Sequence, residues 1–398
     1  MMGETRMDWM YLFYFLFAVL LFFGARYAGR GKWHEDYTSL EQSGVLKGIT
    51  AMLVSLHHMG QKTCGSWHPR PFIVHGLDIF VPVGYLFVGV FFFCSGMGLY
   101  KSLHSKKNYL KGFARRRIAP LVIAFYLSEI IYTLVRLAMG EKMSRLRIFW
   151  YLSGLHLANV NAWYLVTIFF LYLVFWVSFR RCKSEGRAIL WIVLFCLGYS
   201  VLGAFIGRQD RWWMTGEWWY NSVFLFPLGL LFGKHEHKVT ECLNKRYGFF
   251  LPISFIMLFV LFWLSETLNG TVWGYFDAWN DPMKVPHRLM SAGLQWLVAL
   301  DYTAFCFLLL MKVKLSNGAL RFLGGISLSY YLMHGLFVEL FGFNFMDISG
   351  SLFYIRNVAL YILVVLSCTI LSSVAFDWIW RKATAMILTR SPSKQNAV

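Results

Sequence analysis

The chain has 398 residues, of which 58% are hydrophobic, 19% aromatic and only 15% charged, and its formal net charge is +18. This composition excludes an ordinary soluble globular protein and indicates an integral membrane protein. The apolar segments lack the alternation of barrel strands, so the predicted fold class is all-α, a polytopic membrane helical bundle. The basic residues lie in short loops, where membrane topology explains them, so no nucleic-acid partner is expected.

Eleven apolar segments approach the length of about 20 residues that a bilayer requires, which predicts about eleven transmembrane helices. In chain order they are residues 8–25, 42–60, 78–100, 118–138, 162–180, 188–206, 219–233, 248–268, 289–311, 325–342 and 357–380. The first follows MMGETRMD rather than a basic leader, so we expect it to be retained. The chain then divides into an N-terminal helix with an inner loop (1–41), a main membrane domain (42–380) and a polar tail (381–398).

Lysine and arginine are distributed unevenly between the two sets of loops. One set carries 25 of them and the other set, which includes residues 1–8 and 61–77, carries 11. The positive-inside rule then places the N-terminus outside and the C-terminus in the cytoplasm of a cell that holds this protein in its plasma membrane. Membrane lipids are expected partners of the basic loops. Cys64 falls in a predicted outer loop, where a membrane-impermeant maleimide should reach it.

The second segment carries two ionisable side chains on one predicted helix face. Lys47 and His58 are eleven residues apart, which separates them by roughly 16 Å along a helix axis. The same face carries small residues, namely Gly44, Gly48, Ala51 and Ser55. Small side chains allow another helix, or a long thin ligand, to approach the backbone closely.

An ionisable group at membrane depth is costly, which favours a functional role for His58 over simple packing. Its ordinary pKa suits a general base that takes a proton from an acceptor hydroxyl, or a transient acyl carrier. The alternative is that His57 performs this task, although it is rotated by roughly 100° from the Lys47 face.

The most basic loop runs from residue 101 to residue 117 and ends in Arg115, Arg116 and Arg117. Such a run is either a topology anchor beside anionic lipid or a ligand for phosphate groups, which arginine binds with two parallel hydrogen bonds. Both interpretations remain open at this point.

Asp301 and His334 fall near the middle of their predicted spans. A buried carboxylate beside an imidazole fixes its tautomer and raises its basicity, so both are candidate catalytic residues. The sequence does not show which carboxylate meets which histidine. No histidine or cysteine cluster has the spacing of a metal site, so no metal is expected.

Four short blocks occur in a defined order. Lys47 and His58 have ten residues between them, VGVFFFCSGMGLY occupies 88–100, FARRRIAP occupies 113–120, and ISLSYYLMH ends at His334. Together they resemble the motifs of the multi-spanning acyltransferase family 3, over about residues 42–380. Two features depart from the family pattern: Arg117 lacks an arginine three residues away, and the block NAWYLVTIFFLYL lacks the glutamate often found there.

The resemblance implies an acyltransferase that moves an acyl group, usually acetyl, from cytoplasmic acyl-CoA (acetyl-CoA) as co-substrate to a hydroxyl. The acceptor would be a glycan, a lipid-linked sugar or another cell-surface molecule. It also implies that His58 and His334 act in catalysis. From the density of its basic residues we predict that the loop 101–117 binds the nucleotide phosphates through Arg117 and at least one of Arg115 and Arg116, and that Lys47, on the His58 face, also contacts the donor. The alternative is a carrier or flippase for an acylated or polyprenyl-linked glycan, which the lack of a visible internal repeat disfavours.

Overall fold

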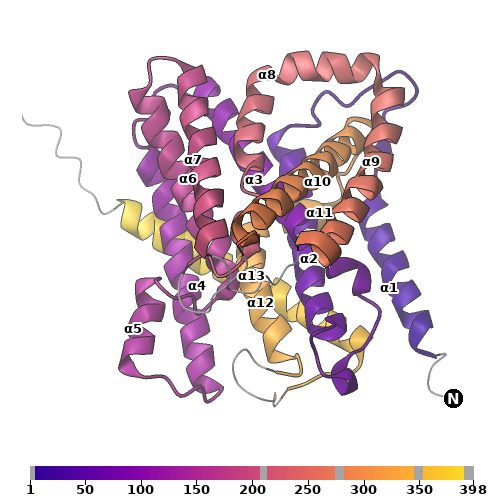
Figure 1. Ribbon diagram of the computed structural model, residues 1–398, viewed down its shortest axis with the longest axis vertical. Coiled ribbons are helices and arrows are strands. Elements are labelled where there is room, and N and C mark those ends of the chain that lie inside the picture. Colours follow the sequence, from indigo (N-terminus) through magenta and orange to yellow (C-terminus); the bar gives the residue numbers. More distant parts are fainter. Residues whose placement is uncertain (1–4, 207–212, 274–281, 345–352, 390–398) are drawn as a thin grey trace, which may run out of the picture.

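A computed structural model describes residues 5–206, 213–273, 282–344 and 353–389, and the chain is helical almost throughout (Figure 1). The α-helices are α1 (Thr5–Phe22), α2 (Leu40–Cys64), α3 (Gly84–Ser105), α4 (Ala119–Ala138), α5 (Arg145–Ser153), α6 (Trp163–Arg181), α7 (Glu185–Ile206), α8 (Leu225–Lys245), α9 (Tyr247–Leu268), α10 (Lys284–Lys312), α11 (Gly318–Gly325), α12 (Ser327–Leu340) and α13 (Val358–Thr389). Short 3₁₀ helices are η1 (Arg70–Phe72), η2 (Asp78–Phe80), η4 (Val160–Ala162) and η5 (Glu217–Trp219), and π-helical turns are η3 (Ala114–Ile118) and η6 (Asn269–Trp273). The described strands are β1 (Arg26–Tyr27) and β2 (Val313–Lys314), which pair antiparallel. The all-α fold class is therefore confirmed.

The predicted count of eleven spans is not confirmed. Within the described ranges, seven helices are long and apolar enough to cross a membrane: α3, α4 with η3, α6 with η4, α7, α9 with η6, α10 and α13. The apolar part of α1, Trp9–Phe22, is shorter. Helix α12 has only 14 residues, because the predicted segment 325–342 begins in α11, which ends at Gly325. Helix α2 carries several polar residues, and the second half of α8 is polar, so neither reaches the hydropathy of a span.

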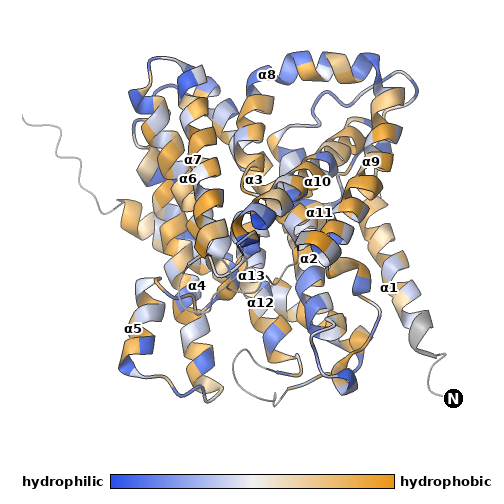
Figure 2. Cartoon of the chain, viewed as in Figure 1, coloured by the Kyte–Doolittle hydropathy of each residue, from blue (hydrophilic) through white to orange (hydrophobic). Residues whose placement is uncertain are grey.

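Most residues of the long helices are hydrophobic (Figure 2). Large hydrophobic residues on α9, α7 and α13, such as Trp263, Trp191 and Leu371, are exposed. A soluble protein would bury such side chains, whereas lipid is a suitable solvent for them. The chain is therefore an integral membrane protein.

Several loops predicted to be cytoplasmic meet at one end of the bundle. Strand β1 in loop 25–41 pairs with β2 in loop 312–321. Lys101 binds Glu236 at 2.7 Å, which joins the start of loop 101–117 to α8, and His104 approaches Glu185 at 3.1 Å. In the loop near β1, Lys314 binds Asp36 and holds the pKa of that carboxyl below its ordinary value. The structure thus agrees with the grouping of these loops, whereas the orientation of the bundle in the membrane stays a prediction.

Cys64 is a poor reporter of that orientation. It is only 9% exposed and its thiol donates to the carbonyl of Val74 at 3.1 Å, so the expectation that a maleimide reaches it is wrong. Trp67, in the same predicted outer loop, is 62% exposed, and Cys242 in α8 is also exposed.

We expect Trp67→Cys to be labelled by an impermeant maleimide in intact cells, and Cys242 to be labelled only after the membrane is permeabilised. The physical reason is that both thiols face water, but on opposite sides of the bilayer. The reverse pattern of labelling would show that the orientation in the membrane is the opposite of the predicted one.

Candidate active site

Helices α2 and α12 bring His58 and His334 together. Their rings are stacked, with centroids 5.2 Å apart and an interplanar angle of 27°. His334 is completely buried, whereas His58 is partly exposed. Two histidines separated by 276 positions therefore form one site, as the sequence could suggest but not show.

Hydrogen bonds fix the tautomers of both rings. Nδ1 of His334 donates to the carbonyl of Tyr331 at 2.6 Å, and Nδ1 of His58 donates to Oε1 of Gln61 at 3.0 Å. Because each Nδ1 carries the hydrogen, each Nε2 keeps a lone pair that can take a proton. Nε2 of His334 is buried with no hydrogen-bond partner among the described residues.

Gln61 is a residue of the candidate site that the sequence interpretation missed, because its side chain orients His58. It lies three positions after His58, a spacing that places two side chains on the same helix face, and this was the available signal. The backbone carbonyl of Gln61 also receives a hydrogen bond from Nε2 of His68 at 2.7 Å. Burial lowers the pKa of His68, which favours the neutral ring.

His57 points in a different direction, toward the start of α3. Its Nδ1 donates to the carbonyl of Phe80 at 2.8 Å, and a Cβ added at Gly84 would overlap its ring. His57 thus packs against the η2–α3 corner, although its ring centroid is only 4.8 Å from that of His58.

Lys47 lies on α2, close enough to Cys94 of α3 for an electrostatic interaction, and is partly exposed. In the part of the chain that the structure describes, no hydrogen bond or ion pair holds its ammonium group. An unpaired cation inside a helical bundle suits an anionic or polar ligand.

The small-residue face of α2 is not open to a ligand, which corrects the sequence interpretation. A Cβ at Gly48 would lie 2.5 Å from the backbone nitrogen of Gly324, so α11 packs directly on this glycine. Ala51 and Ser55 on the same face are also buried. The small residues serve close helix packing rather than ligand access.

The three arginines differ in environment. Arg116 donates to the carbonyls of Tyr109 and Lys111 and so closes the loop before α4. Nε of Arg117 donates to the hydroxyl of Tyr109 at 3.0 Å. Arg115 is exposed and makes no hydrogen bond to the residues described around this loop. Of the three, Arg115 has its whole guanidinium open to a ligand, whereas Arg117 uses only Nε in its bond to Tyr109.

Asp301 is held away from the histidine pair. One carboxylate oxygen accepts from the hydroxyl of Ser254 on α9 at 2.9 Å, and the other is buried without a partner among the residues described. No contact joins Asp301 to either His58 or His334 in the described chain. Its catalytic role stays a prediction that this geometry does not favour.

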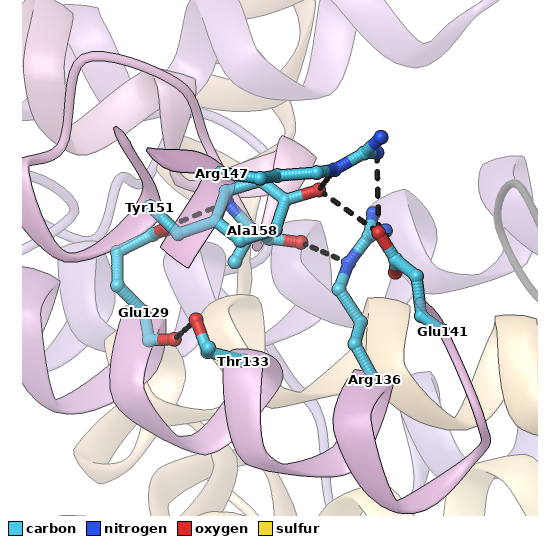
Figure 3. Close-up of polar contacts among 7 residues, drawn as sticks. All are labelled: Glu129, Thr133, Arg136, Glu141, Arg147, Tyr151 and Ala158. Atoms are coloured by element: carbon cyan, nitrogen blue, oxygen red, sulfur yellow. Dashed lines mark hydrogen bonds and ion pairs between the residues drawn. The ribbon is translucent and has the colours of Figure 1, made fainter. Parts of the chain in front are cut away.

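A buried ionic network supports the site from the predicted outer side (Figure 3). Glu129, completely buried on α4, accepts from the backbone amide of Ala158 at 2.6 Å, and Nε of Arg136 donates to the carbonyl of the same residue at 3.1 Å. Arg136 also pairs with Glu141 at 2.6 Å. These bonds hold the segment before α6 in a fixed position against α4.

That segment in turn contacts the helix that carries His334. The side-chain amide of Asn159 and the hydroxyl of Tyr132 both donate to the backbone carbonyl of Leu332 at 3.0 Å, two residues before His334. Beyond the histidines, Lys62 of α2 pairs with Glu339 of α12 at 2.6 Å, approximately one turn further along both helices. The two helices are thus fixed on either side of the stacked rings.

The fold and this site define a helical membrane protein with a buried, tautomer-fixed histidine pair and a basic loop at one end. The described residues hold no group of three histidine, cysteine or acidic side chains that could bind a metal ion. The chain matches the family model of an acyltransferase domain over residues 37–378 and therefore belongs to acyltransferase family 3. Helix α1 lies outside the matched region. No curated protein and no solved structure matches the chain.

Proposed function

We propose that this membrane acyltransferase is an O-acyltransferase of the cell envelope. It takes an acyl group, in the first instance acetyl, from acyl-CoA on the cytoplasmic side and transfers it to a hydroxyl of a glycan or lipid-linked sugar outside. The observation that carries the proposal is the stacked pair of His58 and His334, each with an available Nε2, inside a family whose members are acyltransferases.

His58 is the general base of the proposed reaction. Its Nε2 removes the proton from the acceptor hydroxyl while the oxygen attacks the thioester carbonyl, and the carbon–sulfur bond then breaks. The departing thiolate takes the proton back from the imidazolium. His334 stacks on His58 and so holds its ring in place. Asp301 has no part in this scheme, because its carboxylate faces Ser254.

Lys47 and the basic loop are the groups that bind the acyl donor in this proposal. The rise of a helix separates Lys47 from His58 by roughly 16 Å, so an extended arm can connect a charged group near the cytoplasm to a reacting group deeper in the bundle. Arg115 is available for the nucleotide phosphates, and Lys47 for a polar or anionic part of the donor closer to the thioester.

The test is turnover by the purified protein in lipid. It should release free coenzyme A from acetyl-CoA, and radiolabelled acetyl should appear on an added lipid-linked sugar acceptor. Saturable movement of a glycan across the bilayer without loss of thioester would instead establish a carrier.

Arg115→Gln should raise the KM for acetyl-CoA about threefold to tenfold, the scale of one charge-assisted hydrogen bond, and leave kcat unchanged. The matched control is Arg187→Gln, an exposed arginine of another predicted cytoplasmic loop. Equal changes in the KM values for donor and acceptor would show that Arg115 is only a topology anchor.

A further inference from the structure

Helix α3 has one face that is open where the rest of the helix is covered. From Gly84 to Tyr100 every residue is buried except Ser95 and Gly98, and beyond Tyr100 the helix end is partly exposed at Lys101, Ser102 and Leu103. Spacings of three and four residues place Ser95, Gly98 and Ser102 on the same helix face. The exposure therefore forms a continuous strip that runs from the predicted cytoplasmic end into the bundle.

This strip faces the interior of the protein rather than lipid. Phe91, four residues before Ser95, has its ring centroid 5.7 Å from that of Tyr164 on α6 and 5.9 Å from that of Tyr331 on α12. Ser95 interacts with the hydroxyls of both Tyr164 and Tyr172. The strip thus points between α6 and α12, and Tyr331 is in ring contact with His334.

There is room beside Gly98, where an added Cβ would meet no atom within 4 Å. Arg117 at the start of α4 interacts with Tyr172, so the basic loop reaches the same tyrosine as Ser95.

Two unsatisfied polar groups also point to a ligand here. Nε2 of His334 is completely buried without a partner among the described residues, and the His334 ring contacts Tyr331, which in turn contacts Phe91, one turn beyond Ser95. The Lys47 ammonium, beside Cys94, is likewise without a hydrogen bond in the described part of the chain. Buried polar groups are normally satisfied, so the unpartnered Nε2 of His334 points to a ligand, and the partly exposed ammonium of Lys47 suits an anionic or polar group of that ligand.

We propose that the strip of Ser95, Gly98 and Ser102 is the surface along which the pantetheine arm of the acyl donor lies. The proposal rests on the proposed function and replaces the buried small-residue face of α2 as the route to the histidines. The serine hydroxyls and neighbouring tyrosines offer hydrogen bonds to the amides of the arm, and the absence of a side chain at Gly98 leaves space for its width.

The first experiment measures the binding of free coenzyme A to the purified protein by titration calorimetry. Gly98→Leu should weaken binding at least about tenfold, and Gly198→Leu should leave it unchanged. Gly198, in α7, is the matched control because it is also a helical glycine with no atom near its added Cβ, but it lies on the outer surface. Unchanged binding by Gly98→Leu, or equal weakening by both variants, would overturn the proposal.

The second experiment asks whether the strip faces water. In a Cys242→Ser background, Gly98→Cys should react with a maleimide in the purified protein, and coenzyme A should slow that reaction, because only a hydrated thiol forms the reactive thiolate. Gly198→Cys should show no protection by coenzyme A. A Gly98→Cys thiol that is unreactive, or that reacts equally fast with and without coenzyme A, would contradict the proposed route.

Two outcomes distinguish the route along α3 from the acyltransferase function itself. If the wild-type protein turns over acetyl-CoA but Gly98→Leu binds coenzyme A normally, the acyltransferase function stands and only the route along α3 is wrong. If the wild-type protein neither binds coenzyme A nor consumes acetyl-CoA, both proposals are wrong.

Discussion

Replacing His58 with asparagine should lower the turnover of acetyl-CoA by at least about 100-fold, the scale of a lost acid-base catalyst. Asparagine can still donate a hydrogen bond to Gln61, as Nδ1 of the imidazole does, but it has no second nitrogen that takes a proton. The rate measured at saturating donor and acceptor therefore isolates the loss of Nε2 from any loss of local structure.

The matched control is His57→Asn, in which the amide can replace the bond from Nδ1 to the carbonyl of Phe80. This variant should keep most of the activity, because His57 packs against the start of α3. Both proteins should elute as single species and melt at similar temperatures. If His57→Asn loses activity and His58→Asn keeps it, the assignment of the base must pass to the other histidine.

Gly96→Ala should destabilise the protein by about 1–3 kcal/mol or more, the usual range for overpacking a filled interior. A Cβ at Gly96 would overlap the carbonyl oxygen of Phe226 in α8, and a Cβ at Gly229 of α8 would overlap the carbonyl of Phe93. Neither backbone group can turn aside, so the two helices would have to separate.

The apparent melting temperature in detergent measures this effect, and Gly98→Ala is an internal control two residues away on the same helix. Its added methyl group meets open space, so it should melt at the wild-type temperature or slightly above, since alanine favours a helix over glycine. Equal melting temperatures for the two variants would show that α3 and α8 are not as closely packed as described.

The sequence was sufficient to predict the helical class and the approximate position of most helices, because apolar length is a local property. It was also sufficient to single out His58 and His334, since ionisable groups are rare in apolar segments. The sequence could not show which polar side chains contact each other across the helices. Asp301 is as conspicuous in the sequence as His334, yet it pairs with Ser254, a contact between helices that no local pattern records.

The small-residue face of α2 is a second feature whose role the sequence alone does not reveal. Glycine at residue 48 permits close approach by a ligand or by a helix, and the sequence does not distinguish the two. The structure shows a helix, because α11 presents its own glycine, Gly324, to the same position. The open glycine, Gly98, stands only two residues from Gly96, which is fully enclosed, and only the tertiary arrangement separates their roles.

The reciprocal glycine contact between α3 and α8 has a mechanical consequence. Backbone against backbone leaves no side-chain rotamers to adjust, so these helices must move as one body. We expect α3 and α8 to form one rigid wall of the site. If the proposed function holds, the donor is then admitted where α6 and α12 meet α3 through the rings of Tyr164 and Tyr331, because aromatic side chains can rotate while their helices stay in place.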